Sequence, residues 1–273
     1  MKIKRILVSA LLAASLVFTA GCTGATNDNV DRETIEVTLE AGDTIAEFNI
    51  EGYGTIKAKL YPEIAPTGVD NFVKLAESGY YDGLTIHRVV KDFMFQGGSL
   101  NGDGTGGEAA DGGTFGIEIN EDSRHYYGAL CYANAAGRNS TQFYIVNNNK
   151  PQDITEFDLD IVSSNIDTCK AYKGMYEAGS DGYLYYESQE VYYTNLYNML
   201  KNATDEVKAN YERVGGTPTL DGGYTVFGQV YEGFDVIDSI SASEVKENGG
   251  GELSQPVKTI TITSVTISEY SAE

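Results

Sequence analysis

The sequence predicts a mainly β protein, built as a closed antiparallel barrel that two helices cap. Short segments of alternating apolar and polar residues, bounded by glycine and aspartate clusters, recur along the chain and are typical of antiparallel strands. Two helical segments accompany them. In a chain of 273 residues, many short strands with two helices favour a closed barrel. The expected strands span residues 55–61, 85–90, 129–133, 142–146, 225–230 and 259–267.

The first expected helix lies between the first two strands. Pro66 suits its first turn, and Gly79 suits its end. Its apolar residues recur at helical spacing, which indicates one buried face: Val69, Phe72, Val73 and Ala76. A second, shorter helix is expected at 234–240.

The segment from about 148 to 215 interrupts the strand pattern and is predicted to be a helical insertion. Apolar residues at helical spacing cover 190–214 before Gly215 and Gly216, and a weaker pattern covers 154–178. A structureless loop of this length is unusual in a compact domain, so a helical hairpin is expected. The insertion is rich in tyrosine. These rings could pack the hairpin against the barrel or form a client-binding surface.

The N-terminus has the features of a bacterial lipoprotein signal peptide at residues 1–21. Lys2, Lys4 and Arg5 precede an apolar run at 6–20, and roughly 15 residues are too few for a membrane-spanning helix of about 20. Small residues directly before Cys22 resemble a lipoprotein cleavage site, although Thr19 stands where leucine is usual. A plain secretory signal is the alternative. Both place the protein outside the cytoplasm.

Lipidation of Cys22 would anchor the protein to the extracytoplasmic face of the cell membrane. Residues 22–44 are polar and acidic, which predicts a flexible tether. The whole chain carries 19 basic and 40 acidic residues, with a net charge of −21. This charge disfavours nucleic acid as a partner. It also predicts that the lipid, and not the protein surface, attaches the protein to the membrane. A monomer is expected.

Beyond Cys22 the chain has two cysteines, Cys131 and Cys169. Cys131 lies in a strand-like run and is expected to be a small buried hydrophobe. A disulfide between the two is permitted in an oxidising compartment, and the sequence leaves it open. No cysteine spacing here is typical of a zinc site.

The run from Ile86 to Gly98 places Arg88 and Gln96 in an otherwise apolar, strand-like segment. A charge on the inward face of a sheet costs several kcal/mol unless it is paired or faces a solvent-filled site. Arg88 is therefore expected either to form a structural salt bridge or to serve a binding site.

Three further runs, Ala129–Ala135, Ser140–Ile145 and Leu220–Gly228, follow in the order found in cyclophilin-type peptidyl-prolyl isomerases. The chain resembles this family over about 47–146 and 215–267. The resemblance implies an eight-stranded cyclophilin-like barrel at 45–270, peptidyl-prolyl isomerase activity (EC 5.2.1.8), and no cofactor or metal. Most members have only a short connection in place of the insertion.

The resemblance also implies the site residues. Arg88 matches the catalytic arginine, and Gln96 matches the glutamine that steadies it and contacts the substrate backbone. The positions that match the walls of the proline pocket are Phe93, Met94, Tyr144 and Leu220. Ala133, Asn134 and Ala135 match the strand edge that pairs with the substrate backbone. Gln142 and Tyr224 match further substrate-binding positions.

Three positions depart from better-known members of the family. Tyr144 replaces a phenylalanine and adds a hydroxyl that needs a partner. Tyr224 replaces a histidine, and Thr219 replaces a tryptophan. The expected function is a folding factor for proline-containing polypeptides emerging from secretion. The altered pocket leaves open a client-binding module with weak or no isomerase activity.

Two histidines and one glycine-rich loop complete the sequence-based expectations. His87 is expected to be a hydrogen-bonded neighbour of the site rather than a base, because the reaction transfers no proton. His125 is expected in a surface loop. The loop at 102–107 is expected to rim the substrate groove; nucleotide binding is disfavoured because neither a helix nor a P-loop lysine follows it.

Overall fold

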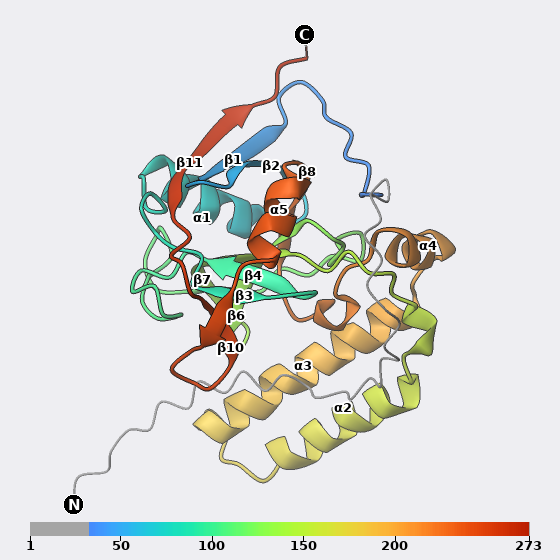
Figure 1. The fold of residues 1–273 in the computed structure, drawn as a ribbon. Helices are drawn as coiled ribbons and strands as arrows, with labels where there is room; N and C mark the ends of the chain where they lie inside the picture. The colour runs from blue at the N-terminus through green and yellow to red at the C-terminus, as the bar shows by residue number, and fades with distance from the viewer. Residues whose placement is uncertain (1–32, 273) are drawn as a thin grey trace, which may run out of the picture. The chain divides into compact units, whose positions relative to one another are not determined.

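The computed structural model describes residues 33–272, and a curled antiparallel sheet lies at its centre (Figure 1). The main sheet has nine strands in the order β11-β1-β2-β8-β6-β7-β4-β3, with β5 paired to β7. Two further strands, β9 (Val245–Glu247) and β10 (Leu253–Pro256), form a separate hairpin. The strands of the main sheet are β1 (Thr44–Ile50), β2 (Gly54–Leu60), β3 (Arg88–Val90), β4 (Met94–Gly97), β5 (Phe115–Gly116), β6 (Ala129–Ala135), β7 (Arg138–Val146), β8 (Val226–Glu232) and β11 (Ile262–Glu269).

The mainly β prediction is confirmed, whereas the closed eight-stranded barrel is not. The sheet path ends at β11 and β3, and these two strands do not pair. An isolated bridge between Thr85 and Thr261 links the segments that precede them. Beside it, the backbone N–H of Ile86 donates to Ile260 O at 2.9 Å. The strand expected at 85–90 is therefore shorter in the structure, where β3 begins at Arg88. The residues before Arg88 make only isolated contacts with the segment before β11.

The two capping helices lie where the sequence predicts them. Helix α1 (Pro66–Glu77) has Pro66 in its first turn, and α5 (Phe234–Ser241) is the second. Phe72 of α1 is fully buried and inserts its ring among three others of the sheet, with ring centroids 5.1–6.1 Å apart: Phe48, Phe143 and Phe227. This aromatic core fixes the sheet on which the site is built.

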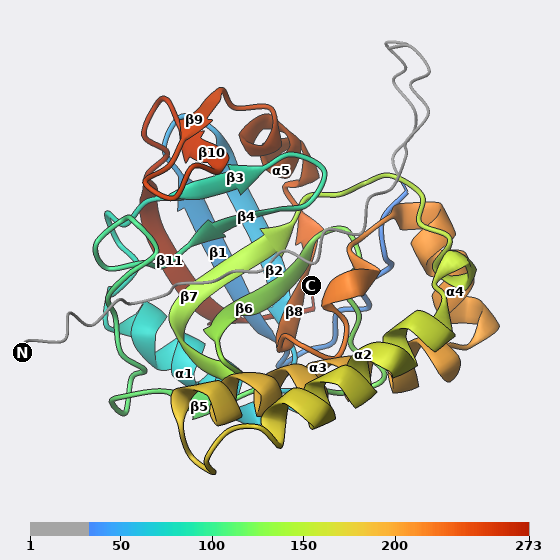
Figure 2. The same cartoon turned by 90° about the horizontal axis from the view of Figure 1, so that it is seen from below.

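The segment 148–215 is helical, as expected, but it contains three α-helices rather than two. They are α2 (Leu159–Lys173), α3 (Asp181–Lys201) and α4 (Asp205–Val214), after a short 3-10 turn, η1 (Ile154–Glu156). Helices α2 and α3 form a hairpin beside the sheet (Figure 2). The expected helix at 190–214 divides because Thr204 caps α4, its hydroxyl accepting from Val207 N at 3.2 Å.

The tyrosines of the insertion fall into two groups. Tyr211 is fully buried in a second apolar cluster with Leu196 and Leu200, so it serves packing. Tyr172 and Tyr176, by contrast, are 44% and 46% exposed. The buried tyrosine agrees with packing of the insertion against the sheet, and the exposed tyrosines agree with a client-binding surface.

Residues 33–43 lack regular structure, yet they contact the domain. Ile35 packs against the cluster under the insertion, and Lys59 Nζ donates to Thr38 O at 3.0 Å. The expectation of a flexible tether reaching to residue 44 is therefore wrong for this portion, because an apolar side chain and a lysine hold it. The expected signal peptide and Cys22 lie outside the described residues.

Cys131 and Cys169 are both buried free thiols, so the disulfide that the sequence left open is not formed. Burial raises the pKa of the Cys131 thiol well above its ordinary value, as expected of a small apolar core residue. In the part of the chain from 33 to 272, no helix combines the length and apolarity needed to cross a membrane.

Candidate active site

Arg88 and Gln96 face each other across the β3–β4 hairpin. They are register partners in the sheet, and Arg88 Nη1 lies 3.4 Å from Gln96 Oε1. The same nitrogen lies 3.9 Å from Met94 Sδ, and the guanidinium carbon is 5.9 Å from the centre of the Phe93 ring. The arginine is thus held over apolar side chains, where a cation and an aromatic face attract each other.

Gln96 continues this polar contact toward the glycine-rich loop. Its Nε2 donates to Gln142 Oε1 at 2.9 Å, and Gln142 Nε2 donates to Gly104 O at 2.9 Å. The structure thereby brings together Arg88, Gln96 and Gln142, and it places the 102–107 loop beside them. The Gln96 amide lies next to the guanidinium and the Gln142 amide next to Gln96, and both suit contact with a peptide backbone.

An apolar cluster lies beside the arginine and contains the residues expected to wall the proline pocket. Met94 and Tyr144 are buried in it, while the other expected members are partly buried. The predicted residues that the cluster brings together are Phe93, Met94, Ala133, Tyr144, Leu220 and Tyr224. Such a surface suits a pyrrolidine ring, whose burial is favourable by the hydrophobic effect.

The end of β6 carries the residues expected to pair with the substrate backbone. Strand β8 pairs with β6 only from Ala129 to Cys131, so Ala133–Ala135 extend beyond that pairing. Asn134 Nδ2 donates to Gly223 O at 2.9 Å, which fixes β6 to the loop that holds Leu220 and Tyr224.

Tyr144 directs its hydroxyl away from solvent to a buried histidine. The Tyr144 hydroxyl oxygen lies 2.8 Å from His125 Nε2, and His125 Nδ1 lies 2.9 Å from Asp221 Oδ1. Because the carboxylate only accepts, Nδ1 carries a proton, and in the neutral ring Nε2 then accepts from Tyr144. The extra hydroxyl of Tyr144 therefore has its partner, and the ring stays available as an apolar wall.

The expectation of a surface position for His125 is wrong. The residue is 1% exposed. Its neighbours Arg124 and Tyr126 contact Met199 of α3 and Tyr211 of α4 in the insertion. Polar neighbours such as Asp122 and Ser123 give this segment the composition of a loop. No local pattern shows that helices distant in sequence cover it.

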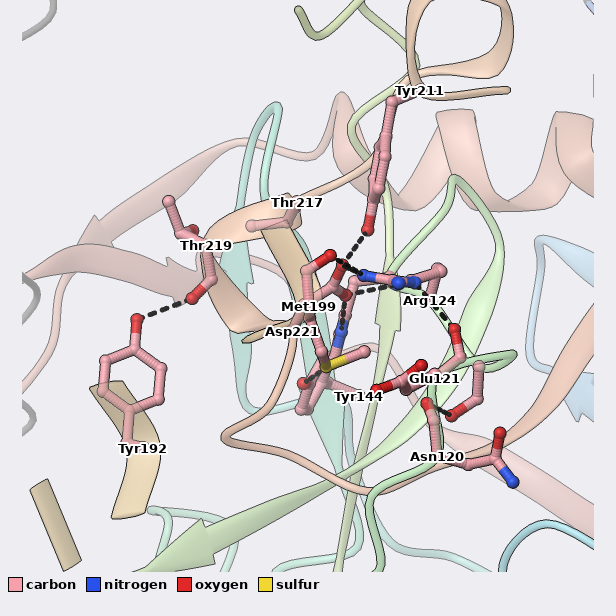
Figure 3. A network of polar contacts seen from close by, with 12 residues as sticks. Asn120, Glu121, Arg124, Tyr144, Tyr192, Met199, Tyr211, Thr217, Thr219 and Asp221 are labelled. Atoms are coloured by element: carbon pink, nitrogen blue, oxygen red, sulfur yellow. Dashed lines mark hydrogen bonds and ion pairs between the residues drawn. The ribbon is translucent and has the colours of Figure 1, made fainter. Parts of the chain in front are cut away.

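Asp221 is the centre of a buried polar network (Figure 3). The residue is 1% exposed, and its Oδ2 accepts from the Tyr211 hydroxyl at 2.8 Å and from Arg124 Nη1 at 3.2 Å. Arg124 Nη1 also donates to Met199 O at 3.2 Å. The loop that carries Leu220 is thereby bonded to α4 directly and to α3 through Arg124. Sequence reasoning missed these residues, although Asp221 directly follows Leu220 in one of the motif runs.

A second contact joins the insertion to the same loop. The Tyr192 hydroxyl of α3 donates to Thr219 O at 2.6 Å (Figure 3). Its ring also occupies the space that a side chain at Gly223 would need. Tyr224 next to it packs edge to face on Tyr144, with ring centroids 6.0 Å apart. The insertion thus supports the wall of the apolar cluster from outside.

His87 precedes the arginine and is neutral at physiological pH. Burial lowers the pKa of His87 to about 4, and the positive charge of Arg88 adds to this shift. Its Nδ1 has no hydrogen-bond partner, so the expected hydrogen bond is not confirmed at that atom. Within residues 33–272, no three or more His, Cys, Asp or Glu side chains gather in a way that could hold a metal ion.

Glu252, another residue that sequence reasoning missed, forms a salt bridge with Arg88. Its Oε2 accepts from Arg88 Nε and its Oε1 from Nη2, both at 2.7 Å. The hydrogen bonds from Arg88 lower the pKa of the Glu252 carboxyl. The structural salt bridge that the sequence left open is therefore present, and it coexists with the apolar cluster on the other side of the guanidinium.

Comparisons with known proteins agree with this geometry. Residues 45–163 and 201–267 match the family model described as cyclophilin type peptidyl-prolyl cis-trans isomerase/CLD. The intervening residues, 164–200, cover most of α2, the connection that follows it and nearly all of α3. A protein of Staphylococcus saprophyticus, provisionally named a peptidyl-prolyl cis-trans isomerase, is 34% identical over 79% of this chain and 88% of its own. A similarly named protein of Staphylococcus aureus is 33% identical over the same shares.

A solved structure shares the fold. The crystal structure of a cyclophilin-type peptidyl-prolyl cis-trans isomerase of Cryptosporidium parvum, in the presence of the dipeptide Ala-Pro, matches with a TM-score of 0.53. The match covers 82% of this chain and 98% of that chain, at 21% identity. On the family model and the staphylococcal relatives, this chain belongs to the cyclophilin-type peptidyl-prolyl cis-trans isomerases.

Proposed function

We propose that this isomerase acts outside the cytoplasmic membrane, anchored by a lipid on Cys22, and assists the folding of secreted or surface proteins. The observation that carries the location is the N-terminal pattern: basic residues, an apolar run at 6–20, and small residues directly before Cys22. The clients would be proline-containing polypeptides emerging from secretion, and the isomerase itself would act as a monomer.

The reaction is rotation about an X-Pro peptide bond. Partial double-bond character gives this rotation a barrier of about 18–20 kcal/mol, which makes the uncatalysed step slow. In the twisted state the imide nitrogen recovers its lone pair and can accept a hydrogen bond. A donor that reaches the nitrogen only in that state lowers the barrier.

The described side chains suit this chemistry. The apolar cluster around Met94 and Tyr144 would hold the proline ring, and the Nη1 edge of Arg88 lies directly over it. Arginine stays protonated at physiological pH, so the donor is always present. The amides of Gln96 and Gln142 and the end of β6 would hold the neighbouring peptide groups. No proton moves, which is compatible with a neutral His87.

A client-binding module with weak turnover is the second candidate function. It is favoured by apolar side chains exposed on the α2–α3 hairpin, among them Tyr172 at 44%, Met175 at 72%, Tyr176 at 46% and Leu184 at 48%. Exposed apolar groups that gather on one surface are typical of interaction sites. A binder would slow the aggregation of an unfolded client regardless of its proline content.

One experiment tests the location. The full-length gene is expressed in a bacterium supplied with a clickable fatty acid, beside the Cys22→Ser variant. We expect lipid label on the wild-type protein in the membrane fraction, and unlabelled variant that is no longer retained there. Wild-type protein without label, or label that persists in Cys22→Ser, would contradict the anchor.

A second experiment separates catalyst from binder. Refolding of a client limited by a proline isomerisation is followed with wild type and Arg88→Ala, together with a client variant that lacks this proline. A catalyst accelerates only the proline-limited phase and loses this effect in Arg88→Ala. A binder changes the yield of both clients equally and keeps its effect in the variant.

A further inference from the structure

Glu252 occupies one edge of the Arg88 guanidinium. The two oxygens of the carboxylate accept from Nε and Nη2 at 2.7 Å each, a paired arrangement that fixes direction as well as distance. The Arg88 side chain is 15% exposed and that of Glu252 is 43% exposed. This is therefore a partly shielded pair with favourable geometry, unlike a solvated surface ion pair.

The arrangement divides the guanidinium into two edges with different surroundings. The Nε–Nη2 edge faces Glu252. Nη1 points the other way, 3.9 Å from Met94 Sδ and 3.4 Å from Gln96 Oε1, above the apolar cluster. The edge nearest the expected position of the proline is thus the edge that the carboxylate leaves available.

Glu252 is itself held in a tight turn between β9 and β10. Asn248 Oδ1 accepts from Gly250 N at 2.9 Å and from Glu252 N at 3.0 Å. Asn248 Nδ2 donates to Ser254 Oγ at 3.2 Å. The hairpin lies beside β3, the strand that begins with Arg88 (Figure 2). The carboxylate is therefore presented from an ordered support.

We propose that Glu252 is a positioning residue for Arg88, fixing its rotamer so that the Nη1 edge faces the imide nitrogen of the bound X-Pro bond. A long arginine side chain otherwise samples many rotamers, and the transition state would have to select the productive one. Glu252 does not touch the substrate in this arrangement. Its loss should lower kcat and leave KM nearly unchanged. The inference rests on the isomerase function of Arg88.

The test measures kcat and KM separately for an X-Pro peptide with wild type, Glu252→Ala, Glu252→Gln and Glu247→Gln. Glu247 is exposed on β9 of the same hairpin and is not a partner of Arg88. Glu247→Gln therefore removes the same charge as Glu252→Gln without removing a contact of Arg88. We expect kcat to fall about tenfold in Glu252→Ala. Glu252→Gln, which keeps one acceptor oxygen, should fall in between, and Glu247→Gln should equal wild type.

A spectroscopic readout tests the positioning directly. Solvent exchange of the Arg88 Nε–H is followed by NMR, with the signal assigned by its absence in Arg88→Lys. We expect slow exchange in wild type and Glu247→Gln, and fast exchange in Glu252→Ala. A folded Glu252→Ala variant with unchanged or increased kcat, or with slow exchange, would overturn the proposal. An inactive wild type would instead contradict the isomerase function, and the exchange rates would still decide whether Glu252 fixes the arginine.

Discussion

The carboxylate of Asp221 accepts a hydrogen bond from the hydroxyl of Tyr211 at 2.8 Å, and both residues are buried. Tyr211 belongs to α4 of the insertion, whereas Asp221 directly follows Leu220 of the apolar cluster. The insertion is therefore bonded, through the interior of the protein, to the loop that carries Leu220. This contact links α4 to the wall of the apolar cluster beside Arg88.

Replacing Tyr211 by phenylalanine should destabilise the protein by about 1–2 kcal/mol, because Asp221 loses one buried donor while the ring is retained. Urea unfolding monitored by circular dichroism measures this change. Tyr176→Phe, at a 46% exposed position of the same insertion, is the control and should stay within about 0.5 kcal/mol of wild type. Equal effects of the two variants would show that the Tyr211 contact contributes nothing specific.

Asp221→Ala should be more damaging, by about 3–5 kcal/mol, because it leaves the buried Arg124 guanidinium without a counter-charge. The Arg124 and Asp221 side chains are 3% and 1% exposed. The control is Asp111→Ala. The Asp111 side chain is a 79% exposed partner of Lys74, so its loss should change the free energy of unfolding by less than about 1 kcal/mol. Denaturant midpoints of both variants decide the matter, and a mild Asp221→Ala phenotype would contradict the network.

Tyr144→Phe separates the ring from the hydroxyl. The apolar wall stays, so we expect the isomerase kcat/KM to remain within about threefold of wild type. His125 Nε2 loses its hydrogen-bond partner, so the free energy of unfolding should fall by about 1 kcal/mol. Peptide isomerisation and urea titration measure the two effects. A large loss of activity at unchanged stability would show that the hydroxyl itself acts on the substrate.

The neutral His87 predicts a pH dependence of stability. Its folded pKa of about 4 lies below the unfolded value of about 6.5, so the unfolded state binds more protons between these limits. The stability that depends on a neutral His87 is therefore fully present above pH 6.5. It is lost as the pH falls from 6.5 toward 4, because the unfolded state then gains protons that the folded state does not bind. Between pH 7 and 5, wild type should lose on the order of 2 kcal/mol more than His87→Gln. Parallel pH profiles of the two proteins would contradict this prediction.

Local sequence patterns predicted the parts of the molecule that depend on neighbours in the chain. The Arg88–Gln96 pairing follows from one strand-like run that folds back on itself, and it is found across β3 and β4. Pro66 and the spacing of apolar residues up to Ala76 located α1 for the same reason. Several residues expected to wall the pocket meet in one cluster, because they lie in the sequence runs that resemble those of cyclophilins.

Contacts between distant segments were not predictable in this way. Glu252 reaches Arg88 across 164 positions, and Asp221 reaches His125 across 96, so no periodicity or short motif relates them. His125 was misplaced because burial under the insertion depends on tertiary packing. The expected closed barrel was not confirmed for a similar reason. The number of strands, which the sequence indicates, does not determine whether β11 and β3 pair.

The most direct measurement is the rate of X-Pro isomerisation in a peptide, comparing wild type, Arg88→Ala and the remote control Arg213→Ala. We expect wild type and Arg213→Ala to accelerate the reaction equally, and Arg88→Ala to lose at least about tenfold in kcat/KM. This loss corresponds to about 1.4 kcal/mol of transition-state stabilisation. A folded Arg88→Ala variant that retains the wild-type rate would contradict the assignment of Arg88 as the catalytic donor.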